Sequence, residues 1–176
     1  YSNLAASFDY TLAYFTTTSI ILNDNIGASM SQKVCECLAK KHHSTIKTLL
    51  VCTFVVLGAF IVLLCVIPAF FLEKILAVLG IQDDLQGKVK KMVLFCLAAF
   101  CVRSVNDLLC QFMLCLGQIH KIGIASALSV FLPVVLSIFM ISVKQSGFDG
   151  VWIALLVHQV IKLCCYLYIL AKDALP

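Results

Sequence analysis

The chain has 176 residues, of which 62% are hydrophobic and only 12% are charged. Soluble domains carry about 25% charged residues, so this composition excludes an ordinary soluble globular protein and predicts an integral protein of the lipid bilayer. The net charge is +4, from 13 Lys and Arg against 9 Asp and Glu, and the basic residues cluster between the apolar runs. This excess therefore bears on membrane topology and lipid headgroups, and a nucleic-acid partner is not expected.

Five apolar runs are long enough to cross a bilayer. They predict an all-α, polytopic membrane helix bundle with spans at about 4–30, 48–72, 92–117, 122–143 and 150–171. We interpret residues 1–176 as a single membrane domain. Because the chain starts at Tyr1 and ends at Pro176 just after a span, we expect it to be a piece of a longer protein.

The first predicted span is unusually polar. It contains Asp9, three consecutive threonines at 16–18, and Asp24 within an Asn-Asp-Asn triplet. Such a helix is not expected to face lipid all round, so we expect it to line a cavity, with Asp24 as a candidate lining residue. Two alternatives remain: a buried helix whose hydroxyls bond to its own backbone, and an Asp24 that simply reaches the interface.

Residues 31–47 are rich in lysine and histidine, which predicts a cytoplasmic loop under the positive-inside rule. Six Lys or Arg then lie inside and five outside, so the charge count supports this orientation only by one residue. The pattern Cys35-x-Cys37-x₄-His42-His43 is not a standard zinc spacing, although a metal site there stays an alternative. Palmitoylation of Cys35 or Cys37 is another.

The second span, 48–72, contains no charge and carries Pro68 near its end, where a membrane helix tolerates a kink. The connector 73–91 has apolar residues at helical spacing until Gly80. Asp83 is suited to start the next helix, because acidic residues favour the N-terminal end of the helix dipole.

The span Met92–Gly117 is the most informative stretch of the chain. It is apolar overall, yet it contains Arg103, Asn106, Asp107 and Gln111. At about 100° per residue these four fall on one helix face roughly 140° wide. Because a charge at the bilayer centre costs at least about 2.5–3.5 kcal/mol, such a face is expected to meet a partner helix or a watery cavity.

Two further spans follow after a tight connector, and the last, 150–171, carries His158, Gln159 and Lys162. His158 and Gln159 are candidate cavity residues. A hydrogen-bonded contact between helices is the alternative for His158. Lys162 is long enough to reach the near interface.

The chain contains ten cysteines, and most of them lie inside apolar runs. In a small secreted protein such a number would indicate disulfides, but within apolar helices cysteine behaves as a small hydrophobe. We therefore expect free, buried thiols at Cys52, Cys65, Cys96, Cys101, Cys110, Cys115, Cys164 and Cys165.

Several segments together resemble the N-terminal half of a multidrug and toxic compound extrusion (MATE) transporter. VIPAFFLEKILAVLGIQDDLQGKVKKMV is similar to the family's exit from helix three. SGFDGVWIALLVHQVIKLCCYLYIL is similar to its helix six, which starts with Gly-x-x-Gly, and the turn after Leu116-Gly117 is similar to its connection between helices four and five. Ser31-Gln32 stands where the family carries such a pair, but Cys35-Glu36-Cys37 replaces the usual Gly-Ala turn.

The resemblance implies that the five spans are helices two to six of twelve, with the 31–47 loop in the cytoplasm. MATE transporters rock two six-helix lobes about a central cavity and export organic cations or other xenobiotics in exchange for protons or sodium. A C-terminal lobe would then be the partner of this chain. The family's coupling acids lie outside this region, so no catalytic or coupling residue is assigned here.

Cavity-lining candidates are Asp24, Asn106, Asp107, Gln111, His158 and Gln159. Arg103 and Asp107 are four residues apart, so a private ion pair that neutralises both is the alternative to cavity contact. Two other functions remain open: a related flippase of lipid-linked substrates, and a membrane subunit that transports nothing. No motif for an enzyme, a cofactor or a metal emerges from the sequence, so none of the three is expected.

Overall fold

The computed structural model describes Thr17 and residues 23–78, 83–142 and 147–173. Within these residues every regular element is a helix and there is no strand, which confirms the predicted all-α class. The elements in chain order are the π-helical turn η1 (Asn23–Gly27), α2 (Ala28–Ala39), α3 (His43–Ile61), the π-helical turn η2 (Val62–Val66), α4 (Ile67–Phe70), α5 (Leu72–Val78), α6 (Asp83–Cys115), α7 (Ile119–Ser142) and α8 (Gly147–Asp173).

Four segments of the described chain are long and apolar enough to cross a membrane. They are Ser44–Phe70, Val89–Cys115, Ile119–Phe139 and Ile153–Lys172. Large apolar side chains such as Val55, Phe131 and Ile138 are more than half exposed on the outside of the bundle. Such exposure is costly in water and favourable in hydrocarbon, so the protein is an integral, multi-pass membrane protein.

These four segments correspond to the predicted spans 48–72, 92–117, 122–143 and 150–171. The predicted span 4–30 lies mostly outside the described residues, whose continuous part begins at η1. Helix α6 starts at Asp83, well before its apolar stretch, as the acidic start signal had indicated. The helices therefore extend beyond the hydrocarbon at several ends, where hydropathy no longer marks them.

The prediction of a loop over residues 31–47 is wrong. Helix α2 continues to Ala39 and α3 starts at His43, which leaves a turn of three residues. Lys41 has φ +57°, its N–H bonds to the Leu38 carbonyl (3.1 Å), and the next N–H bonds to Cys37 (2.9 Å). This is a Schellman ending, usually marked by glycine. Because lysine rather than glycine occupies the left-handed position, the turn could not be recognised from the sequence.

Pro68 changes the helix type just ahead of it. A proline ring clashes with the carbonyl four residues earlier and offers no N–H to it. The preceding turn, η2, is π-helical, and the Ile67 N–H bonds to the Val62 carbonyl five residues back. The wider turn lets Ser44–Phe70 continue as one span through the proline.

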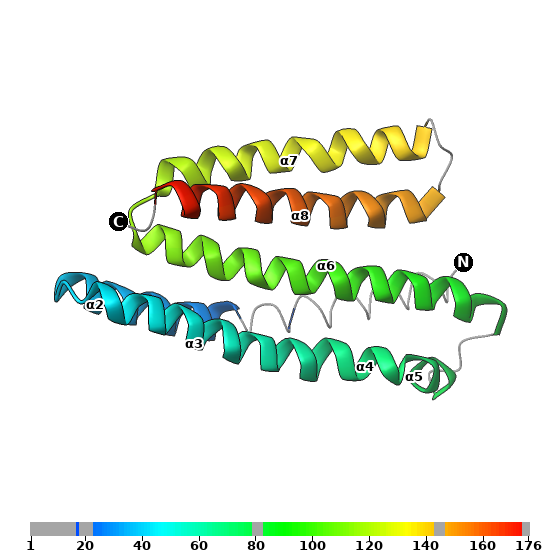
Figure 1. The fold of residues 1–176 in the computed structure, drawn as a ribbon. Coiled ribbons are helices and arrows are strands. Elements are labelled where there is room, and N and C mark those ends of the chain that lie inside the picture. The colour runs from blue at the N-terminus through cyan, green and yellow to red at the C-terminus, as the bar shows by residue number, and fades with distance from the viewer. Residues whose placement is uncertain (1–16, 18–22, 79–82, 143–146, 174–176) are drawn as a thin grey trace.

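Helix α6 is the centre of the bundle. Figure 1 shows α8 and then α7 on one side of it, and α2 with α3 on the other. One apolar cluster, around Met30, Leu57 and Phe112, fills the space between α2, α3 and α6. A second, around Met113 and Tyr166, fills the space between α6, α7 and α8. Because α6 is packed from both sides, its polar residues have different surroundings.

Helix α5 is tied to the start of α6 by an ion pair between Glu73 and Lys90. The hydrogen bond and the positive charge of Lys90 lower the pKa of the Glu73 carboxyl. Lys33 likewise lowers the pKa of Glu36 within α2, where Lys33 Nζ lies 3.0 Å from the carboxylate. Both pairs are exposed; Lys33 and Glu36 lie outside the four membrane-spanning segments, and Lys90 lies in the first turn of one of them.

Candidate functional site

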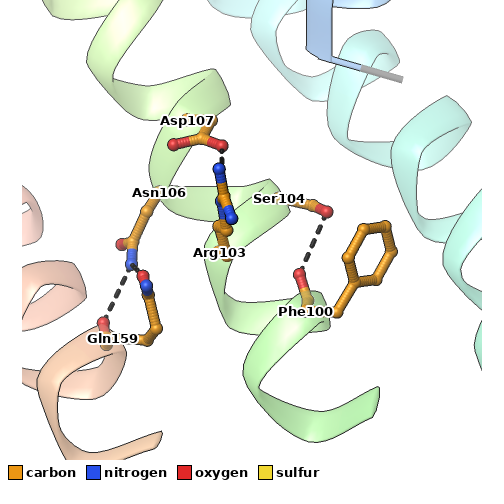
Figure 2. A network of polar contacts seen from close by, with 6 residues as sticks. All are labelled: Phe100, Arg103, Ser104, Asn106, Asp107 and Gln159. Carbon is orange, nitrogen blue, oxygen red and sulfur yellow. Dashed lines mark hydrogen bonds and ion pairs between the residues drawn. The ribbon is translucent and has the colours of Figure 1, made fainter. Parts of the chain in front are cut away.

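Arg103 and Asp107 lie near the middle of the membrane-spanning part of α6. Arg103 Nε is 3.6 Å from Asp107 Oδ2, one helical turn away (Figure 2). The Arg103 side chain is 56% exposed and the Asp107 side chain 28% exposed. The pair therefore lies on an open side of the bundle, and we call it the charged strip.

A third charge belongs to the same region. Lys162 of α8 is close enough to act electrostatically on the Asp107 carboxylate, and its ammonium also lies 5.5 Å from the centre of the Tyr166 ring. Two positive side chains, Arg103 and Lys162, therefore lie near one negative side chain, Asp107. Counted over the described side chains alone, the region carries a net positive charge of one at mid-membrane depth, where any charge calls for a counter-ion or water.

Asn106 is turned away from the charged strip and toward α8. Its Nδ2 donates to the backbone oxygen of Gln159 at 2.9 Å and to Gln159 Oε1 at 3.0 Å (Figure 2). Both side chains are buried, and Asn106 is fully so. Asn106 Oδ1 is buried with no hydrogen-bond partner among the described residues. These two candidates therefore meet each other and link α6 to α8 through a buried amide pair.

Gln111 is turned the other way, toward η1 and α2. Ser31 donates to Gln111 Oε1 at 3.3 Å, and the Cys115 thiol donates to the Ser31 carbonyl at 3.7 Å. A Cβ on Gly27 would lie only 2.3 Å from Gln111 Oε1. The absence of a side chain at Gly27 is therefore what lets the Gln111 amide fit against η1.

The predicted polar face of α6 is therefore divided among three surroundings. Asn106 binds α8, Gln111 binds α2 and η1, and Arg103 with Asp107 occupies the open side between them. The roles of Gly27, Ser31 and Lys162 were not found by the sequence reasoning. Gly27-x₃-Ser31 has the small-residue spacing typical of close helix contacts, so a signal for the first two was present.

Of the other two candidates, the structure describes only the side chain of His158. His158 is half-buried, its ring lies against the Ser129 backbone of α7, and its buried Nδ1 has no hydrogen-bond partner among the described residues. The backbone of Asp24 is part of η1, whereas the position of its side chain is not described by the structure. No hydrogen bond or ion pair joins His158 to Arg103 among the described residues.

Metal binding has no support in the described part of the chain, where no three His, Cys, Asp or Glu side chains gather to hold an ion. Cys35 is exposed and Cys37 half-buried on α2, and both are free. Comparison with models of protein families, with curated proteins and with solved structures finds no match. Fold and composition define the class, an integral multi-pass helix bundle, and the site has to be interpreted from its own chemistry.

Proposed function

We propose that this chain is part of one lobe of a secondary active antiporter of the MATE kind, which exports organic cations or other xenobiotics in exchange for protons or sodium. The charged strip carries the proposal. A carboxylate at the middle of a membrane span, 28% exposed beside a guanidinium, suits the wall of a water-filled cavity better than a lipid-facing surface. The second lobe, outside this chain, would form the opposite wall.

Each residue then has a distinct role. Asp107 attracts a cationic substrate, and Arg103 holds the carboxylate when the cavity is empty. The Asn106–Gln159 link keeps α6 and α8 moving as one body, which alternating access requires of a lobe. The Gln111–Ser31 contact does the same for α6 and α2.

One observation favours a second function, a flippase of lipid-linked substrates. Arg103 and Lys162 together outnumber Asp107 in charge. A guanidinium can bind a phosphate through two parallel hydrogen bonds, which suits the diphosphate of a lipid-linked sugar. The two functions therefore differ in the residue that they require: antiport requires Asp107, and flipping of a diphosphate requires Arg103.

The test uses the complete protein in proteoliposomes and compares Asp107→Asn with Arg103→Gln. Antiport predicts that efflux of a fluorescent organic cation follows a proton or sodium gradient. It also predicts a loss of about tenfold or more with Asp107→Asn, as expected for a lost contact of about 1.4 kcal/mol, and a smaller loss with Arg103→Gln. Flipping of a lipid-linked diphosphate predicts the reverse order. Efflux that persists after both gradients are collapsed would exclude antiport.

The double variant separates transport from folding. If either single change lowers the folded yield and the double change restores it, Arg103 and Asp107 serve to neutralise each other, as in a subunit that transports nothing. If all three variants fold and only Asp107→Asn loses transport, the carboxylate contacts the substrate. Folded yield is measured by size-exclusion chromatography in detergent.

A further inference from the structure

A shallow cavity of about 270 Å³, open to the outside of the bundle, lies between the η2–α4 segment and α6, away from the charged strip. Its walls are apolar except for two thiols, Cys65 from η2 and Cys101 from α6. Phe70 and Leu97 are among the other lining residues, and both walls belong to membrane-spanning segments. A molecule that reaches this cavity must therefore be soluble in hydrocarbon.

The two thiols are neighbours across the contact between η2 and α6. Cys65 belongs to the buried apolar cluster there, Cys101 packs against that cluster, and both side chains line the same cavity. Cys65 is only 3% exposed. The π-helical turn that Pro68 imposes adds a residue to the helix here and so helps to set the direction of Cys65. A disulfide requires Cα atoms within about 7 Å of each other, a spacing that residues facing each other across a helix–helix contact can reach.

We infer that Cys65 and Cys101 form an oxidisable dithiol, and that a membrane-dissolved quinone in the adjacent cavity is its oxidant. Two S–H bonds break and one S–S bond forms. Two electrons and two protons pass to the quinone, which leaves as a hydroquinone. Every product is neutral, which suits a site in hydrocarbon, and polar oxidants such as glutathione disulfide are kept out by the lipid.

The size of the cavity fits this oxidant. Pockets for drug-sized ligands measure about 300–1,000 Å³, so 270 Å³ suits a single substituted ring and leaves an isoprenoid tail in the lipid. The disulfide would join η2 covalently to α6. The inference does not depend on transport, because the chemistry can be followed in the absence of any gradient.

A second thiol pair in the same chain provides an internal comparison. Cys115 at the end of α6 bonds to the Ser31 carbonyl of α2, and Cys35, one turn further along α2, is exposed on its surface. These two thiols lie at the α2–α6 contact and outside the apolar cavity. Glutathione disulfide should oxidise them more readily than the cavity pair, whereas a quinone should prefer the cavity pair.

The experiment uses the complete protein in nanodiscs under argon, treated with either a short-chain benzoquinone or glutathione disulfide. Free thiols are alkylated, and cross-linked peptides are identified by mass spectrometry. We expect quinone to produce the Cys65–Cys101 disulfide at least tenfold faster than glutathione disulfide does, with one hydroquinone formed per disulfide. Equal rates with both oxidants, or a cavity pair that stays reduced, would overturn the inference.

Variants provide the second readout. Cys65→Ala and Cys101→Ala should each abolish hydroquinone formation, while Cys164→Ala, a change of an exposed thiol on α8, should leave it unchanged. Hydroquinone formation that persists in the Cys65→Ala/Cys101→Ala double variant would assign the reaction to other thiols and overturn the inference. The cross-link in the wild-type protein decides the question even if a variant fails to fold.

Discussion

The link between Asn106 and Gln159 provides a quantitative test of how α6 is held to α8. Asn106 donates to both the backbone oxygen and the side-chain oxygen of Gln159, at 2.9 and 3.0 Å. Asn106→Ala removes both hydrogen bonds. Gln159→Ala removes only the side-chain acceptor, because the backbone carbonyl stays. The bond between Asn106 Nδ2 and Gln159 Oε1 is therefore the one that either substitution removes.

The magnitude follows from that shared bond. Interhelical hydrogen bonds in membranes contribute about 0.6 kcal/mol on average and up to about 1.7 kcal/mol. Asn106→Ala also removes Oδ1, a buried acceptor without a partner, and this relief of about 1–3 kcal/mol can hide the loss of two bonds. In a double-mutant cycle, Asn106→Ala is made once in the wild-type protein and once in the Gln159→Ala variant. The loss of Oδ1 contributes equally to both measurements and cancels in their difference. We expect a coupling energy of about 0.6–1.7 kcal/mol.

The assay is unfolding in mixed micelles by increasing SDS, followed by far-ultraviolet circular dichroism, for wild type, both single variants and the double variant. The matched control pairs Asn106→Ala with Ser126→Ala, whose hydroxyl lies 3.1 Å from Tyr166 Oη at the α7–α8 contact. These two changes should add within about 0.3–0.5 kcal/mol. A coupling below about 0.3 kcal/mol between Asn106 and Gln159 would refute the interhelical bond as described.

Two further predictions concern the ends of the bundle. Gly27→Ala places a Cβ against the Gln111 amide, which must turn away and lose its bond to α2, so we expect a loss of about 1–3 kcal/mol in the same unfolding assay. Gly58→Ala, whose Cβ meets nothing within 4 Å, should be neutral or stabilising, and equal losses at both glycines would contradict the contact. Because Lys90 lowers the pKa of Glu73 from 4.5, the pair stabilises the fold above about pH 4.5 and ceases to do so as the pH falls through the lowered value. The stability difference between wild type and Glu73→Gln, measured by pulse proteolysis, should therefore be steady near neutral pH and shrink in acid, and a difference independent of pH would count against the ion pair.

Hydropathy was sufficient for the class of the protein and for four of its spans. Helix ends were harder to predict, since helices continue into polar sequence beyond the hydrocarbon. The hairpin between α2 and α3 turns at Lys41, which has a left-handed backbone conformation. A glycine at this position would have indicated the turn in the sequence. The matching turn after α6 uses Gly117, φ +77°. A tight connector was predicted here over 118–121, but α7 already starts at Ile119, so the predicted bounds lie too far along the chain. The same backbone motif was thus visible in one place and hidden in the other.

The sequence alone is sufficient to show that α6 carries one polar face, because the periodicity of a helix fixes the direction of each side chain around its axis. It could not determine what stands opposite that face. Only the packing of α8 on one side and α2 on the other assigns Asn106 to one neighbour and Gln111 to the other. Arg103 and Asp107 remain on the open side because no described helix covers that direction fully, and this leaves them available for the proposed chemistry.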